Sequence, residues 1–219
     1  MLAILRALSF VFRQGRDMAT DSPVLPSIPM PLSWGVQPVS WNIGGDGALA
    51  ITAGPRTDMF VNPAGTDLVL NAPRLLFAPA DDFMLSARVM VEFAATYDAG
   101  VLLLYAGERS WAKLCFEYSP QRQPMIVSVV TNGFSDDANA YVVVGNQTFL
   151  RIARLGRAFA LHASDDGAYW QLIRNFTLEP AAQLTAGFVA QSPTGAGCTA
   201  TFADIVYTPT RLADLRSGV

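Results

Sequence analysis

The sequence predicts an all-β sandwich of two antiparallel sheets, and three observations support this fold class. Polar and apolar residues alternate in many short segments, turn-forming residues separate these segments, and no segment after residue 20 has a convincing helical period. The 14 prolines and 17 glycines suit many short strands joined by turns. Hydrophobic residues make up 51% of the chain and charged residues 15%, so the chain can bury a substantial core.

Residues 1–31 are predicted to be an N-terminal extension with a proline-rich linker, and residues 32–219 to form the domain. The apolar start is too short to span a bilayer and lacks the cleavage site of a signal peptide. Its three arginines leave a weak amphipathic anchor or transit segment as an alternative. With only two cysteines, Cys115 and Cys198, both expected to be reduced thiols, we predict a cytoplasmic protein without a membrane span.

The clearest predicted strand covers residues 83–94, where Phe83, Leu85 and Ala87 alternate with Met84 and Ser86. Gly156 in "RLGR" predicts a tight hairpin that needs positive φ. The remaining strands are expected at residues 48–52, 68–78, 100–106, 125–131, 140–145, 148–154, 158–164, 169–176, 184–190 and 199–208.

The stretch "SWAKLCFEYSP", residues 110–120, carries a lysine and a glutamate four residues apart. Its alternation predicts a strand, with Trp111, Lys113, Cys115 and Glu117 on one face and mostly apolar residues on the other. Four residues of strand span about 13 Å, too far for Lys113 and Glu117 to pair directly. Each must therefore find a partner on a neighbouring strand or stay available for a ligand.

Several motifs together resemble the regulation-of-enolase-like family, whose function is largely unknown. They are "PVSW", "RTDMF", "AGVLLLY", "SWAKLCFE", "MIVSVVT", "SDD", "FLRIAR" and "SDDGAYW", and the resemblance runs from about residue 33 to residue 207. The resemblance implies a concanavalin A-like lectin/glucanase fold, a jelly-roll sandwich with a partly open concave sheet. It implies no known reaction, and the N-terminal extension departs from its pattern.

The resemblance also supplies a set of candidate ligand-binding residues on the concave face. Matched by position to the family's motifs, they are Asp58, Trp111, Lys113, Glu117, Ser128, Thr131, Asp136 and Arg151. We expect the indole of Trp111 to offer an apolar platform for a sugar ring, while Lys113 and Glu117 orient its hydroxyl groups. A solvated sheet face with charges paired across strands is the alternative interpretation.

Three functions are compatible with these residues. The leading one is a non-catalytic module that binds carbohydrate or another small polar ligand on the concave face. The second is an intracellular regulatory protein that docks a metabolic enzyme. The third is a glycan-acting hydrolase or lyase, which would need a second acid beside Glu117, supplied from another strand by Asp58, Glu92 or Asp136.

Other features predict no further chemistry: no catalytic residue, cofactor or metal site is expected. With 15 basic and 18 acidic residues the net charge is −3, and no basic stripe suggests a nucleic-acid partner. "NGFSDDANA" is interpreted as a solvated loop rather than a calcium site. Asp166 in "SDDGAYW" predicts an Asx-type hairpin turn, and His162 a partly exposed strand residue.

Overall fold

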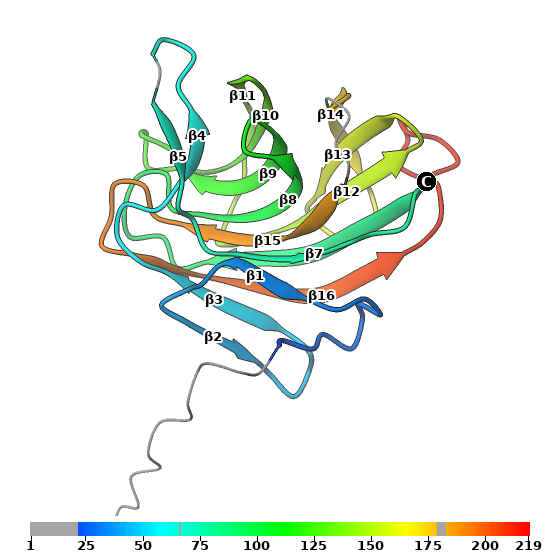
Figure 1. The fold of residues 1–219 in the computed structure, drawn as a ribbon, viewed down its shortest axis with the longest axis horizontal. Helices are drawn as coiled ribbons and strands as arrows, with labels where there is room; N and C mark the ends of the chain where they lie inside the picture. Colours follow the sequence, from blue (N-terminus) through cyan, green and yellow to red (C-terminus); the bar gives the residue numbers. More distant parts are fainter. Residues whose placement is uncertain (1–21, 66, 179–182) are drawn as a thin grey trace, which may run out of the picture.

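Two antiparallel sheets of seven strands each face one another across a hydrophobic core (Figure 1). The computed structural model describes residues 22–65, 67–178 and 183–219, and these residues contain sixteen strands and no helix. The all-β sandwich predicted from the alternation is therefore confirmed. Within the described ranges no helix is present that could cross a membrane.

The first sheet carries most of the residues discussed below, and its outer face points away from the second sheet. Its strands are, in spatial order, β1 (Ser33–Val36), β6 (Arg74–Phe77), β15 (Thr185–Gln191), β8 (Ala99–Gly107), β9 (Ser110–Tyr118), β10 (Pro124–Asn132) and β11 (Phe134–Val142).

The second sheet forms the other layer of the sandwich. Its strands are, in spatial order, β14 (Gln171–Phe176), β13 (Ala158–Ser164), β12 (Gln147–Leu155), β7 (Phe83–Val91), β16 (Cys198–Thr208), β3 (Leu49–Ala53) and β2 (Ser40–Ile43). Strands that are neighbours in these sheets are often distant in sequence, as β16 is from β3 and β7, so turn residues alone do not specify the topology.

A two-stranded hairpin, β4 (Met59–Val61) and β5 (Leu68–Leu70), packs onto the first sheet beside β11. Figure 1 shows it in cyan beside the green strands β8–β11. Met59 and Val61 are fully buried in a second hydrophobic cluster that also contains Trp111 and Cys115. The backbone N–H of Val61 donates to Ser135 Oγ of β11 at 2.9 Å. The hairpin therefore encloses part of the outer face of the first sheet.

The segment predicted to be a solvated loop, "NGFSDDANA", is mostly strand β11, and the prediction of a loop there is wrong. The chain turns at Gly133, whose φ is 85°, directly after β10. As the last strand of its sheet, β11 has a neighbour on one side only, and most of its residues are exposed. It therefore lacks the apolar alternation by which strands such as β7 were predicted.

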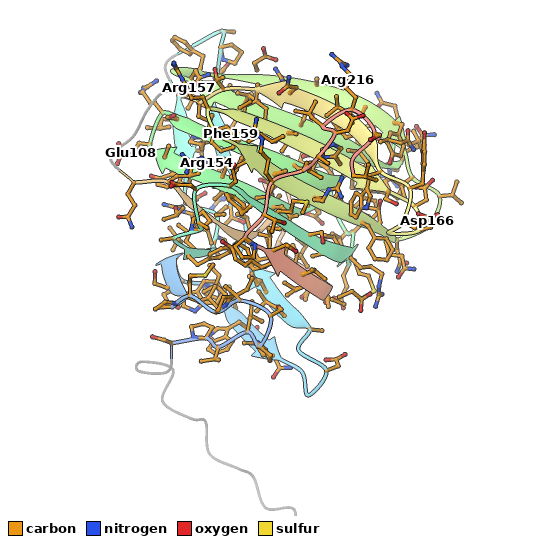
Figure 2. The ribbon with its side chains drawn as sticks, turned by 90° about the vertical axis from the view of Figure 1, so that its right-hand side faces the viewer. Glu108, Arg154, Arg157, Phe159, Asp166 and Arg216 are labelled. Carbon is orange, nitrogen blue, oxygen red and sulfur yellow. The ribbon has the colours of Figure 1, made fainter. Side chains whose placement is uncertain are left out.

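Two hairpins in the second sheet match the turns predicted for them. Gly156 has a φ of 65° between β12 and β13, as the tight hairpin requires. At the next turn Asp166 Oδ1 accepts hydrogen bonds from the backbone N–H groups of Ala168 and Tyr169, both at 2.8 Å, which is an Asx-type turn. Figure 2 shows Arg157, beside the first of these turns, and Asp166, in the second, at opposite ends of the sheet.

The start of the packed chain differs from the predicted boundary. Leu25, Ile28 and Leu32 are buried and belong to the main core, so the residues from Leu25 onward pack against the sandwich and do not form an extended linker. The rest of the predicted extension, residues 1–21, lies outside the described residues.

Candidate functional site

Strand β9 alternates as predicted, but both of its faces are buried over most of its length. Ala112, Leu114 and Phe116 point into the main core between the sheets. Trp111 and Cys115 point to the outer face and join the second hydrophobic cluster beneath the β4–β5 hairpin. Lys113 and Glu117 lie on this outer face as well, beside β8 on one side and β10 on the other.

A pocket of about 300 Å³ opens on this outer face. Its polar walls are formed by side chains from four separate parts of the chain: Asp58, Lys113, Glu117, Asp137 and Gln191. Its apolar walls are formed by Phe60, Tyr97, Val127 and Val129. Three of the residues predicted from sequence, Asp58, Lys113 and Glu117, therefore meet here although they are up to 59 residues apart (117 − 58).

Lys113 lines the pocket, is buried, and is already engaged by protein groups. Its Nζ donates to Gln191 Oε1 at 3.0 Å and to Asp58 Oδ1 at 3.3 Å, and it lies 5.6 Å from the ring centre of Trp111. Burial alone would lower the pKa of Lys113, but electrostatic interactions, chiefly with Asp58, outweigh burial and raise the pKa above its ordinary value. Lys113 therefore remains charged, and its charge is balanced by Asp58.

Gln191 and Asp58 are held by further contacts. Gln191 Nε2 donates to the backbone oxygen of Tyr97 at 3.5 Å, and Asp58 Oδ1 accepts from the backbone N–H of Met59 at 2.7 Å. Lys113 thus links the hairpin, through Asp58, to strand β15, through Gln191. These polar groups form a connected network that positions the pocket walls.

Glu117 differs from these residues because its carboxyl group accepts no hydrogen bond from any described residue, and neither does that of Asp137. Burial raises the pKa of Glu117 to about 7; Lys113 opposes this rise, while Asp58 and Asp137 add to it. Glu117 therefore exchanges its proton near neutral pH. A carboxyl group with this pKa can either donate or accept a hydrogen bond in that range.

Tyr97 forms one wall of the pocket from a strained backbone position. Its φ is 71°, which is unfavourable for a residue with a side chain, and the residue is 40% exposed. The loop is held by the buried Asp98, whose carboxylate accepts from the backbone N–H groups of Ala94 and Ala95 and from Ser192 Oγ. Strain that is maintained by a buried network is common at functional sites.

The other predicted site residues lie outside the pocket. Trp111 is fully buried, and its Nε1 donates to the backbone oxygen of Glu108 at 3.3 Å, so the indole cannot serve as a platform for a sugar ring. Thr131 faces the same side but is buried, where it shares a 2.9 Å hydrogen bond with Ser135. Both residues contribute to the packing of the hairpin.

Ser128 and Asp136 lie on the opposite face of the first sheet, where both interact with Arg174 of β14. Arg174 Nη2 lies 2.9 Å from Asp136 Oδ1, and Arg174 Nη1 donates to Ser128 Oγ at 3.5 Å. Alternation of side chains explains this result, because Asp136 pairs with Val130 on the inner face while its neighbour Asp137 pairs with Val129 on the outer face. The acidic residue that reaches the pocket is Asp137.

Arg151 lies on the outer face of the second sheet, whereas the pocket lies on the first sheet. Its guanidinium group packs 4.2 Å from the ring centre of Trp170 and donates to the backbone oxygen of Gly218.

His162 is fully buried, not partly exposed as predicted, because the C-terminal segment packs over it. Its Nε2 lies 2.8 Å from the backbone oxygen of Leu215, and burial lowers the pKa of His162 to about 4. Figure 2 shows this segment crossing the sheet toward Arg216.

Six pocket residues were not among the predicted site residues: Phe60, Tyr97, Val127, Val129, Asp137 and Gln191. Gln191 could have been predicted, because it is the last residue of an apolar strand. It lies two residues after the outward-facing Val189 and therefore points to the same face. Asp137 was hidden by the interpretation of its strand as a loop. Nothing in the local sequence around Tyr97 predicts its position at the pocket.

A protein-family model described as "Protein of unknown function (DUF1349)" matches residues 34–210. The chain belongs to this family. The match covers most of the domain and agrees with the resemblance noted in the sequence at the level of a family of unknown function, and it carries no reference to enolase. A comparison with curated protein sequences finds no match.

Solved structures with the same fold include a functionally unknown protein from Saccharomyces cerevisiae. It is 22% identical, has a TM-score of 0.74, and the alignment covers 81% of this chain and 95% of that one. A mutant of the GH43 protein BlXynB from Bacillus licheniformis is 14% identical with a TM-score of 0.65, over 80% of this chain and 36% of that one. A xylan β-1,4-xylosidase from Bacillus halodurans is 13% identical with a TM-score of 0.58, over 74% and 33%.

This chain therefore spans about a third of the length of these two glycoside hydrolase chains. At such low identity the similarity is one of fold. It supports the jelly-roll sandwich, and the residues of the pocket must be interpreted from their own geometry.

Proposed function

We propose that this protein binds a small polar ligand, most simply one carbohydrate unit, in the pocket on the outer face of the first sheet. The observation that carries the proposal is the pocket itself: about 300 Å³, lined by aromatic side chains and by two carboxyl groups without a hydrogen-bond partner among the described residues. This volume is at the small end for ligand sites and suits a single sugar ring. Hydroxyl groups of a sugar would supply the missing hydrogen bonds.

The structural neighbours support the class of ligand only through shared fold. One of them is named as a xylan β-1,4-xylosidase, and others are GH43 glycoside hydrolases. The pocket supports the proposal more directly, because sugar sites combine an aromatic wall with polar groups that orient hydroxyls. Here Tyr97 supplies the exposed ring, in place of the buried Trp111.

Binding can be tested by calorimetric titration with a panel of monosaccharides and short oligosaccharides. We expect Tyr97→Ala to weaken binding about tenfold, because the stacking surface is lost. The matched control is Tyr169→Ala, whose ring is also exposed but lies at the Asp166 turn, and it should bind like the wild type. Equal affinities for the two variants, or no binding of any sugar by the wild type, would contradict the proposal.

A glycan-acting enzyme is the second candidate, and a specific observation favours it. The second acid that the sequence did not place is present, because Asp58 and Asp137 line the same pocket as Glu117. A carboxyl group with a pKa of about 7 suits a general acid near neutral pH. New reducing ends or unsaturated products after incubation with glycans would establish this activity, and Glu117→Gln should then abolish it.

The docking of a metabolic enzyme remains a third proposal. The exposed edge strand β11 supports it, since Phe134 and Val142 are half exposed there and an edge strand can pair with another chain. A cytoplasmic location also stays a prediction. It is supported by Cys115 and Cys198, which are both free and buried.

A further inference from the structure

The basic and acidic groups of the pocket differ in whether protein groups already bind them. The single basic group, Lys113, is buried and already bound to Asp58 and Gln191. A ligand would therefore find little positive charge available to it. An anionic ligand, such as a uronic acid, would have to compete with Asp58 for Lys113.

The acidic groups are arranged in the opposite way. Asp137 is exposed on β11 and Glu117 is half buried on β9, and no described residue forms a hydrogen bond or ion pair with either carboxyl group. Both lie close enough for Asp137 to raise the pKa of Glu117. The groups left for a ligand are thus two mutually repelling carboxyl groups.

The apolar walls complete this arrangement. Phe60 and the exposed ring of Tyr97 border the same pocket as the two carboxyl groups. Aromatic faces attract a cation, and they do not attract an anion. A protonated amine in the pocket would relieve the repulsion between Glu117 and Asp137 and could contact an aromatic wall at the same time.

We infer that the preferred ligand carries a protonated amino group, and that among carbohydrates the pocket selects amino sugars over neutral sugars and uronic acids. This inference rests on the proposed binding function and specifies its ligand class. Asp137 and Glu117 provide the specificity, while the Lys113–Asp58–Gln191 network maintains the shape of the pocket.

The test compares matched sugars that differ in one charged group. Glucosamine, glucose and glucuronic acid, and the corresponding galactose series, would be titrated into the full-length protein at about pH 7 by calorimetry. We expect at least one amino sugar to bind about tenfold more tightly than its neutral counterpart, the uronic acids to bind most weakly, and the preference to decrease as salt is added.

Two neighbouring substitutions provide the matched variants. Asp137→Asn should abolish the preference for the amino sugar, because the amide retains an oxygen that accepts hydrogen bonds but carries no negative charge. Asp136→Asn, one residue away but on the opposite face beside Arg174, should retain the preference. Equal loss in the two variants, or retention in both, would overturn the role of Asp137.

Proton release offers a second readout in the same titrations. The groups that face Glu117 are Lys113 and Cys115 on its own strand, Asp58 before β4, Asp137 on β11 and Tyr97 in the loop before β8. An ammonium group bound among these residues would stabilise the ionised form of Glu117. Binding should therefore release protons, seen as a heat that varies with the ionisation enthalpy of the buffer.

The outcomes separate the inference from the proposed function. If neutral sugars bind as tightly as amino sugars, the inference fails while carbohydrate binding stands. If uronic acids bind most tightly, the inference fails and Lys113 must be available to the ligand. If no sugar of any charge binds, both fail together.

Discussion

Glu117 illustrates how burial controls the chemistry of a single residue. Its pKa is raised to about 7 mainly because the carboxylate is desolvated, with repulsion from Asp58 and Asp137 adding to the effect. An unfolded glutamate is ionised above its ordinary pKa of 4.5, whereas the folded protein keeps the proton until about pH 7. Between these values the folded state binds one more proton than the unfolded state.

We therefore expect Glu117 to lower stability as the pH rises from about 4.5 to 7, with no further loss above that range. Glu117→Gln mimics the protonated form, so the variant should match the wild type near pH 4.5 and exceed it at pH 8 by an amount on the order of 3 kcal/mol. Urea denaturation of both proteins across this range measures the difference.

The comparison between the two proteins isolates Glu117 from other titrating groups. His162, whose pKa burial lowers to about 4, acts in the opposite direction and is present in both proteins. Parallel stability curves for wild type and variant would show that Glu117 ionises normally in the folded state.

At the scale of secondary-structure elements, the β4–β5 hairpin defines the site. It brings Asp58 to Lys113 and Phe60 to the pocket, and it buries Met59 and Val61 against the outer face of the first sheet. An outer sheet face covered in this way becomes a second core. Polar residues at its margin then become the walls of a pocket.

Trp111→Ala should therefore destabilise the protein by about 3–5 kcal/mol, because it leaves a cavity in the cluster that holds the hairpin. Trp111→Phe should cost less, since most of the volume is kept. Chemical denaturation provides the measurement. A loss of ligand binding with no loss of stability would instead show that the indole contacts the ligand directly.

The whole molecule is a sandwich whose packed chain begins before the first strand. Leu25 lies within the stretch interpreted from sequence as a linker, yet it is fully buried in the main core. Its neighbour Val24 is largely exposed. The alternation of burial shows that this proline-containing segment is packed against the sandwich.

We expect Leu25→Ala to reduce the free energy of unfolding by about 2–5 kcal/mol, because a buried leucine is lost from a packed core. Val24→Ala should change stability by less than about 0.5 kcal/mol, since surface substitutions rarely do more. Thermal or urea unfolding of the two variants distinguishes a packed segment from a linker, for which both substitutions would be neutral.

The sequence by itself was sufficient to predict the all-β class, most of the strands and the common face of Trp111, Lys113 and Glu117. Each of these depends on alternation within one segment, which a single strand expresses without reference to the rest of the chain. Most of the edge strand β11, residues 134–139, was missed because exposure on both faces removes that signal.

The tertiary structure decided which residues of that face are available to a ligand. Whether Trp111 is exposed depends on the hairpin that covers it, and whether Asp136 or Asp137 reaches the pocket depends on the pairing of β10 with β11. The pocket unites residues from β4, β9, β10, β11, β15 and two loops, which only the strand order brings together. Alternation determines on which face a side chain lies, but only packing between distant segments determines what covers that face and which charges remain unpaired.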